Sequence, residues 1–539
     1  MAARSSLRLT VLITLTLVSI LALPVYSQTD RGIIEVLVLD ENEGVIPGVT
    51  VTVTRPETGF QAVEVTEATG LARFLALQPG TYSVIADLSG FGSVSQEDMV
   101  LRTGQTQKIT LILRPRAAET ITVEASSDVV DVYRSDTSSN IIPEQIESLP
   151  VADRDFQKLA FIAPGVQRER GGFRFIGGGP VVGASGNASQ ATILVDGLDY
   201  TDPALGLSRT KFSQDAIREF RVIQNRFDPE IGGSSGGALS IVTKSGTNNL
   251  SGTVFGFARD EALREPGDLE QDEKDYSRYQ LGFTVGGPIT RDRTHFFGAF
   301  EYVDEDNISL FRPGGAFADL AADVEHPFTQ YLGFVSLDHQ ISTDQSLAGK
   351  FVYEDYSEEN FRVGGIADVS YGQSLERENW NVSANHTWIL SNGKLNELRV
   401  QAGNHWYFEP TNSDEVGEWF SSGTTLQTGS NLLGDLLGEG DFYEIRDTYH
   451  MSLADGRHNL KMGAAYQYID ERSDIPVYQN GLFLWVFDNR SLPLAYAYGT
   501  GSSDISTSSA TSATRSASPT AAACSIATSN RPTSSVDRT

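Results

Sequence analysis

Apolar and polar residues alternate along most of the second half of the chain. From residue 250 onward the alternation is clear over 280–286, 380–388, 398–403 and 460–468. A period of two residues predicts β-strands with one apolar and one polar face. Strands with aromatic ends are typical of an outer-membrane barrel wall, although a soluble antiparallel sandwich gives a similar pattern. The second half is therefore predicted to be an antiparallel sheet.

Shorter strands separated by turns are expected near the N-terminus, over residues 31–114. The segment Val49–Thr54 alternates with period two, and Gly70, Pro79–Gly80 and Gly90 punctuate the later strands. Turn residues at such short spacing are typical of sandwich folds. Residues 31–114 are therefore predicted to form a β-sandwich.

The turn residues of this segment also carry a family pattern. Gly44, Pro47-Gly48-Val49, Pro79-Gly80-Thr81-Tyr82 and Gly90-Phe91 resemble the pattern of carboxypeptidase regulatory-like domains. The resemblance implies a transthyretin-like or carbohydrate-binding-like fold without catalytic activity.

The middle of the chain, residues 136–248, mixes helical and extended signals. A short helix is predicted within Ile142–Pro150, where a proline lies near the start. The segment Ile193–Asp199 places Asp-Gly between two apolar runs, which predicts a hairpin, and Ile217–Ile223 reads as the next strand. An α+β domain is therefore expected here, after a linker over 115–135.

The junction between the middle and the second half carries the most specific motif. Phe227–Asn248 and Ser251–Gly256 resemble the passage from the plug to the first barrel strand of TonB-dependent outer-membrane receptors. The pieces of 136–248 follow the order found in the Oar-like branch of that family, and Gln280–Tyr302 resembles its second and third barrel strands. The resemblance implies a plug domain over 136–248 and an antiparallel transmembrane barrel over 250–500.

A short β-branched segment in the linker, Glu119 to Ala125, is a candidate partner-binding site. It resembles a TonB box, the strand that pairs with the TonB energy-coupling complex by adding to a sheet edge. The predicted site residues are Glu119, Thr120, Ile121, Thr122 and Val123. An ordinary extended linker is the alternative.

The N-terminus carries the features of a secretory signal peptide. Arg4 and Arg8 precede the apolar run Leu9–Leu23, and Val25-Tyr26-Ser27 offers small residues for cleavage. These features predict a signal peptide over 1–27, with an uncleaved anchor helix as the alternative. Together with a barrel, an exported chain is expected in the outer membrane.

The charge balance argues against some partners. The chain has 70 acidic and 41 basic residues, a net charge of −29. Nucleic acid is excluded as a partner because its recognition needs clustered Lys and Arg, although the acidic balance serves solubility equally well. The single cysteine, Cys524, excludes an internal disulfide and a cysteine-based metal site.

Catalytic signals are weak, and the chain is predicted not to be an enzyme. No histidine is followed by Glu three residues later, so the ligand spacing of a zinc carboxypeptidase is missing. Gly232–Gly236 matches the G-x-S-x-G motif of hydrolases with Ser234 as nucleophile, but a β-rich run follows where a helix is required. No cofactor or metal is expected. The acidic stretches Asp260–Asp275, Asp304–Asp306 and Asp355–Glu359 are predicted as surface loops, with calcium binding as the alternative.

The last segment, residues 502–539, departs from every pattern before it. It is rich in Ser and Thr and contains no Phe, Tyr or Trp, so it is predicted to be disordered. Plugged transporter barrels have about 22 strands, and 250–500 accommodates only about half of them. We therefore expect a partial barrel, arising from a frameshift near Gly499 or from a fragment, with a genuine disordered tail as the alternative.

The combined expectation is a mostly β chain: an N-terminal β-sandwich, an α+β plug, a partial antiparallel transmembrane β-barrel and a disordered tail. Its expected function is binding and import of a ligand through a plugged barrel, with TonB and outer-membrane lipid as partners. The ligand stays open among a glycan, a peptide and a metal chelate. The alternative is a cell-surface adhesion or carbohydrate-binding protein that uses the N-terminal sandwich.

Overall fold

The computed structural model describes residues 30–498 and 505–506, apart from several short segments. The segments left out are 116–120, 124–136, 150, 152–153, 169–179, 183–190, 203–206, 225–230, 232–233, 235, 264–275, 392, 454–457 and 491–492. No helix among the described residues has the length and apolar character needed to cross a membrane. The predicted signal peptide and nearly all of the predicted tail lie outside the described residues.

Two packed sheets form the N-terminal sandwich, which we define as the described residues from 30 to 123. The sheets have the orders β4-β1-β7 and β3-β2-β5-β6-β8. The strands are β1 (Gly32–Leu39), β2 (Thr50–Arg55), β3 (Phe60–Val65), β4 (Leu71–Leu77), β5 (Gly80–Asp87), β6 (Val94–Leu101), β7 (Thr106–Ile112) and β8 (Ile121–Val123). Alternate side chains such as Ile34, Val36 and Val51 are fully buried between the sheets. The apolar face of each sheet leaves water only against the other, so the predicted sandwich is confirmed.

A separate five-stranded sheet belongs to what we call the inner domain, the described residues from 137 to 248. Its order is β13-β12-β15-β14-β9. The elements are β9 (Thr137–Ile141), α2 (Pro143–Ser148), η2 (Phe156–Ile162), β10 (Val166–Arg168), β11 (Pro180–Val182), β12 (Ala191–Val195), β13 (Leu198–Asp199), η5 (Gln214–Ala216), β14 (Ile217–Gln224) and β15 (Gly237–Thr243). The predicted hairpin is confirmed: Val195 pairs with Leu198, and Asp196 and Gly197 both have positive φ (50° and 80°).

The third region, which we call the wall, is a ten-stranded sheet in which chain neighbours are mostly sheet neighbours. Its order is β16 (Ser251–Asp260), β17 (Ser277–Thr290), β18 (Thr294–Asp306), β21 (Phe328–Ser342), β22 (Gln345–Phe361), β23 (Gln373–Ser391), β24 (Lys394–Glu409), β27 (Leu436–Leu453), β28 (His458–Asp474) and β31 (Ile505–Ser506). All the pairings are antiparallel. Outward apolar side chains such as Phe283, Val335 and Tyr443 are exposed. The predicted antiparallel sheet is therefore confirmed.

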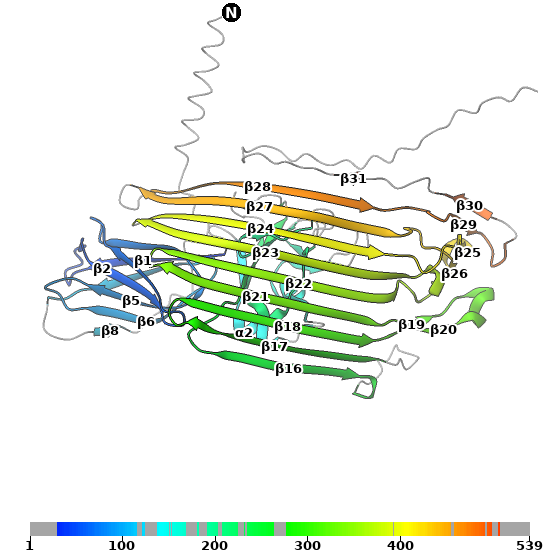
Figure 1. Cartoon of the computed structure of the whole chain (residues 1–539), viewed down its shortest axis with the longest axis horizontal. Coiled ribbons are helices and arrows are strands. Elements are labelled where there is room, and N and C mark those ends of the chain that lie inside the picture. The colour runs from blue at the N-terminus through cyan, green and yellow to red at the C-terminus, as the bar shows by residue number, and fades with distance from the viewer. Residues whose placement is uncertain are drawn as a thin grey trace, which may run out of the picture.

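The two ends of the wall differ in their connections. Tight turns join the strands at one end, for example between Thr290 and Thr294 and between Ser342 and Gln345. Longer connections at the other end carry η6 (Glu261–Leu263), β19 (Ile308–Phe311), η7 (Gly315–Leu320), β20 (Ala322–Glu325), η8 (Val369–Tyr371), β25 (Gly417–Phe420), η9 (Ser421–Gly423), β26 (Leu426–Thr428), β29 (Leu482–Trp485) and β30 (Pro493–Ala497). We call these the short-turn end and the long-loop end (Figure 1).

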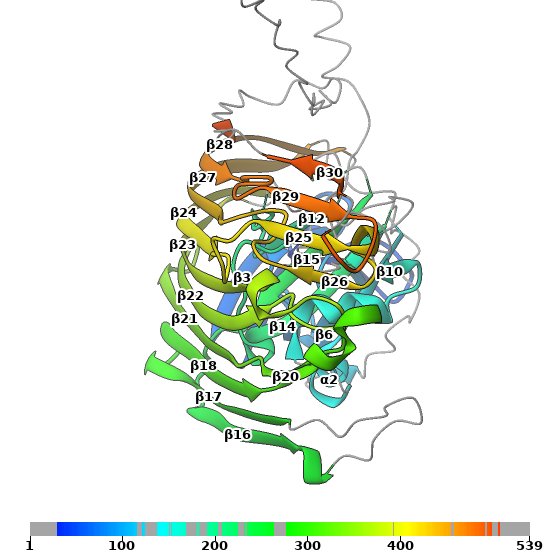
Figure 2. The ribbon, with the colours of Figure 1, turned by 90° about the vertical axis from the view of Figure 1, so that its right-hand side faces the viewer.

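The inner domain and the N-terminal sandwich both contact the wall. The wall curves, and the inner domain lies on its concave side (Figure 2). The N-terminal sandwich lies at the short-turn end, where Arg73 donates to Ser452 Oγ at 3.0 Å and Ile389 packs against the sandwich core. The inner domain is thus bordered by the wall and by the sandwich.

The prediction that the acidic stretches lie between strands is wrong for two of the three. Asp304–Asp306 belongs to β18 and Asp355–Glu359 to β22. Both lie at the long-loop ends of their strands, and each pairs with a neighbouring strand. The strands are longer than the apolar alternation suggests, because backbone pairing continues beyond the apolar band. Most of the third stretch, residues 264–275, lies outside the described residues.

Candidate functional site

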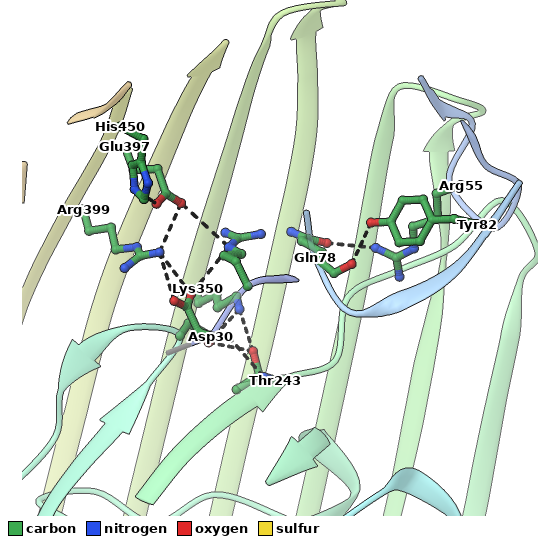
Figure 3. Close-up of polar contacts among 11 residues, drawn as sticks. Asp30, Arg55, Gln78, Tyr82, Thr243, Lys350, Glu397, Arg399 and His450 are labelled. Carbon is green, nitrogen blue, oxygen red and sulfur yellow. Dashed lines mark hydrogen bonds and ion pairs between the residues drawn. The ribbon is translucent and has the colours of Figure 1, made fainter. Parts of the chain in front are cut away.

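Polar side chains connect the inner domain to the concave face of the wall. At the centre is the β12–β13 turn, where Asp196 accepts from Thr243 and forms an ion pair with Lys350 of β22 at 2.6 Å (Figure 3). Lys350 Nζ also donates to Thr243 Oγ1 at 2.6 Å. Burial alone would raise the pKa of Asp196, but the charge of Lys350 and the hydrogen bonds hold that pKa below its ordinary value.

A second cluster connects the start of the sandwich to the wall. Asp30 accepts from Arg399 Nη2 of β24 at 3.1 Å, and the same nitrogen lies 3.1 Å from Glu397 Oε1 (Figure 3). Arg31 approaches Glu397 at 3.8 Å, and His450 Nε2 of β27 lies 3.5 Å from it. All five residues are buried. Charges removed from water need partners of this kind, so the cluster fixes where the chain enters the sandwich.

The residues after the hairpin extend this contact along the wall. Tyr200 Oη and Asn381 Oδ1 are 2.6 Å apart, and both residues are buried. Gln401 Nε2 donates to the carbonyl of Asp199 at 2.9 Å, and Asp199 N donates to Glu444 at 3.1 Å. Burial, together with the negative charge of Asp196, raises the pKa of Tyr200, so its hydroxyl stays protonated and can donate.

Apolar contacts lie beside the polar ones where the inner domain meets β18, β21 and β22. Phe297, Phe334 and Val352 of the wall belong to the same buried cluster as the core of the inner domain. Phe212 stacks on Phe156 with centroids 4.8 Å apart and reaches Phe334 at 6.3 Å. The interface therefore has an apolar side and a polar side.

A cavity of about 300 Å³ lies between the inner domain and the wall, next to the long-loop ends of β18 and β22. Its charged lining residues are Arg154, Asp155, Lys158, Lys211, Arg278, Glu301, Glu305 and Glu358. Most of these charges have partners: Lys211 lies 3.3 Å from Asp155, Arg278 pairs with Glu305, and Glu358 lies 2.7 Å from His326. With four basic and four acidic groups, the cavity suits a polar ligand with little net charge.

The sandwich holds one strand of the inner domain directly. Glu219 of β14 accepts from Thr103 N at 2.7 Å and from the Thr103 hydroxyl. Glu57 of the sandwich lies 3.5 Å from Arg218 of β14 and 3.2 Å from Arg55. Although burial opposes it, the two guanidinium charges hold the pKa of Glu57 below its ordinary value. Arg55 also donates to Gln78, whose carbonyl accepts from the Tyr82 hydroxyl at 2.6 Å (Figure 3).

The predicted TonB-box residues are only partly described. Glu119 and Thr120 lie outside the described residues, whereas Ile121, Thr122 and Val123 form strand β8. This strand pairs in parallel with β6 of the sandwich, with Val94 opposite Ile121 and Gln96 opposite Val123. The three described residues of the segment are thus extended.

The residues of the polar interface were not predicted as a site. The Asp196–Gly197 turn was predicted only as a turn, Arg399 was predicted only as a polar position of an alternating strand, and Lys350 was not singled out. One signal in the sequence was available: charged residues on the inward face of a wall strand need partners inside. Which partner each one meets depends on contacts between residues as far apart as Asp30 and Arg399.

Ser234, the nucleophile of the G-x-S-x-G alternative, lies in a local turn. The Ser234 hydroxyl donates to the carbonyl of Gly237 and accepts from Gly237 N at 3.0 Å, which is a local turn contact. Within the described part of the chain, no group of three or more His, Cys, Asp or Glu residues could hold a metal ion.

Two family models match the chain. The carboxypeptidase regulatory-like domain matches residues 33–114, and the outer membrane beta barrel domain matches residues 242–311 and 313–492. The first coincides with the sandwich and the second with the wall and its connections. The barrel family implies an outer-membrane location.

Two solved structures that align with the chain are an outer membrane transporter and a ferric enterobactin receptor, and the likeness to both is distant. The transporter YddB of Escherichia coli aligns with a TM-score of 0.49 at 13% identity, over 68% of this chain and 52% of its own. A mutant of the ferric enterobactin receptor of Pseudomonas aeruginosa aligns with a TM-score of 0.47 at 14% identity, over 63% and 50%. The chain spans about half the length of these structures.

A curated relative is more informative. The TonB-dependent transporter Oar of Myxococcus xanthus is 29% identical over 270 residues, which cover 47% of this chain and 25% of Oar. The matches are to transporters and receptors and give the adhesion alternative no support. The chain is therefore a homologue of the TonB-dependent transporter Oar, with a carboxypeptidase regulatory-like domain ahead of an outer membrane β-barrel domain.

Proposed function

We propose that the chain acts as a TonB-dependent outer-membrane receptor that binds and imports a ligand, with the inner domain as its plug. In this proposal the ligand binds at the long-loop end. TonB then binds the segment Glu119–Val123 and pulls, and the inner domain moves relative to the wall. The path opens on the concave face of the wall.

The polar side of the interface between the inner domain and the wall is the observation that carries the proposal. A plug must be held firmly at rest and yet leave its place repeatedly. The contacts made by Asp196, Asp199 and Tyr200 can be exchanged for contacts with water, so breaking them costs less than exposing an apolar interface of equal area. A purely apolar interface would argue for a permanent core.

The cavity at the long-loop end is the proposed ligand site. It joins residues of the inner domain, such as Lys211, to residues of the wall, such as Glu305 and Glu358. A ligand that contacts the inner domain and the wall together can change how stable the docked position of the inner domain is. Coupling between ligand binding and plug movement requires such a change. The balanced charges favour a glycan or a peptide over a strongly anionic metal chelate.

Deletion of residues 119–125 tests the proposal. Cells that carry the deletion should still bind the ligand at the surface and should lose its uptake, because binding needs only the cavity whereas uptake needs the TonB contact. The probes are a labelled oligosaccharide, a labelled peptide and a ferric chelate, each measured for surface binding and for energy-dependent uptake.

A matched deletion controls for the shortened linker. Removing residues 128–134 takes away the same number of residues and leaves the predicted TonB box in place, so uptake should be largely kept. Uptake that survives the deletion of 119–125, or that is lost equally in both deletions, contradicts the assignment of the TonB box.

A further inference from the structure

The three described residues of the predicted TonB box form one edge of the five-stranded sandwich sheet. The sheet order is β3-β2-β5-β6-β8, so β8 is the last strand in the described part of this sheet. It pairs on one side with β6 through Val94–Gln96, and no described strand pairs with its other side. In Figure 1, β8 lies at the margin of the sandwich, away from the wall.

The part of β6 that pairs with β8 has three residues, the same number as β8. Val94, Ser95 and Gln96 are 4%, 7% and 7% exposed. Just beyond them, Asp98 has a positive φ of 54° and the pairing with β5 shifts register. A bulge of this kind bends a strand and ends regular pairing, so three residues of β6 are open to a neighbour at this edge.

The described chain after β7 also lies beside β6. Gly92 N donates to the carbonyl of Arg114 at 2.9 Å, and Phe91 forms an isolated bridge with Pro115. The chain is therefore held beside the start of β6 up to Pro115, and Ile121–Val123 pair with the same strand.

We propose that the N-terminal sandwich is a docking platform for TonB, in which β6 holds residues 121–123 as an extended edge strand and a strand of TonB adds to the outer edge. This inference rests on the proposed function, because it takes Glu119–Val123 as the TonB-binding segment. A strand has hydrogen-bonding groups on both edges, so pairing with β6 leaves the outer edge available.

The platform lowers the cost of binding. A free linker must lose conformational freedom when it becomes a strand, whereas β8 is already extended in the folded chain. TonB should therefore bind the full chain more tightly than it binds a peptide with the sequence of residues 115–126. A difference of about tenfold or more is expected.

A disulfide between β6 and β8 tests whether β8 stays paired with β6 when TonB binds or must first separate from it. Neighbouring strands lie about 4.8 Å apart, within the Cα separation that a disulfide spans, and Ser95 is opposite Thr122. The test protein is the full chain with Ser95→Cys, Thr122→Cys and Cys524→Ser. The control lock is Thr50→Cys with Val65→Cys, a cross-strand pair at the far edge of the same sheet, in the same background.

The measurement is the affinity of the purified C-terminal domain of TonB for each protein, oxidised and reduced. The platform predicts that the oxidised β6–β8 lock binds as tightly as the reduced protein or up to about tenfold more tightly, and that the control lock has no effect. Loss of binding on oxidation, restored by reduction, overturns the proposal because β8 must then leave β6. Failure of the disulfide to form also overturns it.

The peptide separates this inference from the proposed function. If neither the peptide nor the full chain binds TonB, the assignment of the TonB box fails, and the platform fails with it. If the peptide binds as tightly as the full chain, the TonB box stands and only the platform is overturned.

Discussion

The interior of the N-terminal sandwich and the polar contacts between the inner domain and the wall are both buried, but they are built from different residues. Val36, Val51 and Leu111 are 0%, 0% and 1% exposed, and their neighbours are apolar. At the interface, buried contacts are made by pairs such as Asp196 with Lys350. Apolar burial stabilises a fold but does not depend on the direction of each contact. Ion pairs and hydrogen bonds hold two groups in one relative position, and each group can exchange its partner for water. These properties suit the sandwich to persist and, in the proposed function, suit the interface to be broken and remade.

The largest expected effect comes from opening the sandwich core. Phe74→Ala removes a ring that is 3% exposed and should lower the free energy of unfolding of the sandwich by about 3–5 kcal/mol. Urea unfolding of the full chain, followed by hydrogen exchange of the β1 and β7 amides, measures the change. Val63→Ala is the control, since Val63 is 57% exposed and its truncation should cost less than about 0.5 kcal/mol. Equal effects of the two would contradict the core assignment.

An intermediate effect is expected at the polar interface. Lys350→Met leaves the Asp196 carboxylate without its cation and should destabilise docking of the inner domain by about 1–3 kcal/mol. Hydrogen exchange of β12 and β15 reports the loss.

The second substitution in a double-mutant cycle sharpens this test. Adding Asp196→Asn to Lys350→Met should recover part of the loss, because the unpaired charge is then removed. Arg472→Met is the control, since the pair it forms with Glu439 at 3.7 Å is exposed and contributes little. Additive effects of the two interface substitutions would show that Asp196 and Lys350 do not act as a pair.

Acid should weaken the same contact. The pKa of Asp196 is lowered in the folded protein, so its contribution to docking is present above its unfolded pKa and is lost as the pH falls through the folded value. Protection of β12 should therefore decrease below about pH 4, and this dependence should be reduced in Lys350→Met. An unchanged pH profile in the variant would contradict the role of the ion pair.

The smallest effect, of opposite sign, is expected where the sandwich faces the β21–β22 turn. Burial, with the charges of Asp344 and Glu67, raises the pKa of Glu64 to about 7. The unfolded chain loses this proton at lower pH than the folded one, so stability falls between about pH 4.5 and pH 7. Glu64→Gln should remove the dependence and stabilise the chain at neutral pH by about 1–2 kcal/mol. Thermal unfolding of the unsubstituted protein and of Glu64→Gln at pH 5 and pH 8 measures the pH dependence and the stabilisation. Equal pH dependence of these two proteins would contradict the role of Glu64.

Local patterns in the sequence were sufficient for most of the fold. The alternation over 281–285 predicted which side chains of β17 face outward, and the Asp196–Gly197 pair predicted a hairpin that needs two positive φ angles. Both features depend on neighbours along the chain, which the sequence lists directly.

Long-range features could not be predicted in the same way. The contact between Asp30 and Arg399 joins residues that no local pattern connects. The strand ends were misplaced because charged residues such as Glu305 continue the backbone pairing of β18, and pairing leaves no signature in side-chain polarity. The five residues Glu119–Val123 stay a prediction as a TonB contact.

The parallel pairing of β1 with β7 separates the point where the chain enters the sandwich from the point where it leaves. Because the two strands run in the same direction, the chain enters the sandwich beside Asp30 at the wall and leaves it at the opposite end, after Ile112. At about 3.3 Å per residue, the two points are roughly 25 Å apart. In the proposed function, a pull on the chain beyond Ile112 would act at a distance from the Asp30–Arg399 contact and would exert a torque about it. We therefore expect tension along the linker to tilt the sandwich at the rim of the wall.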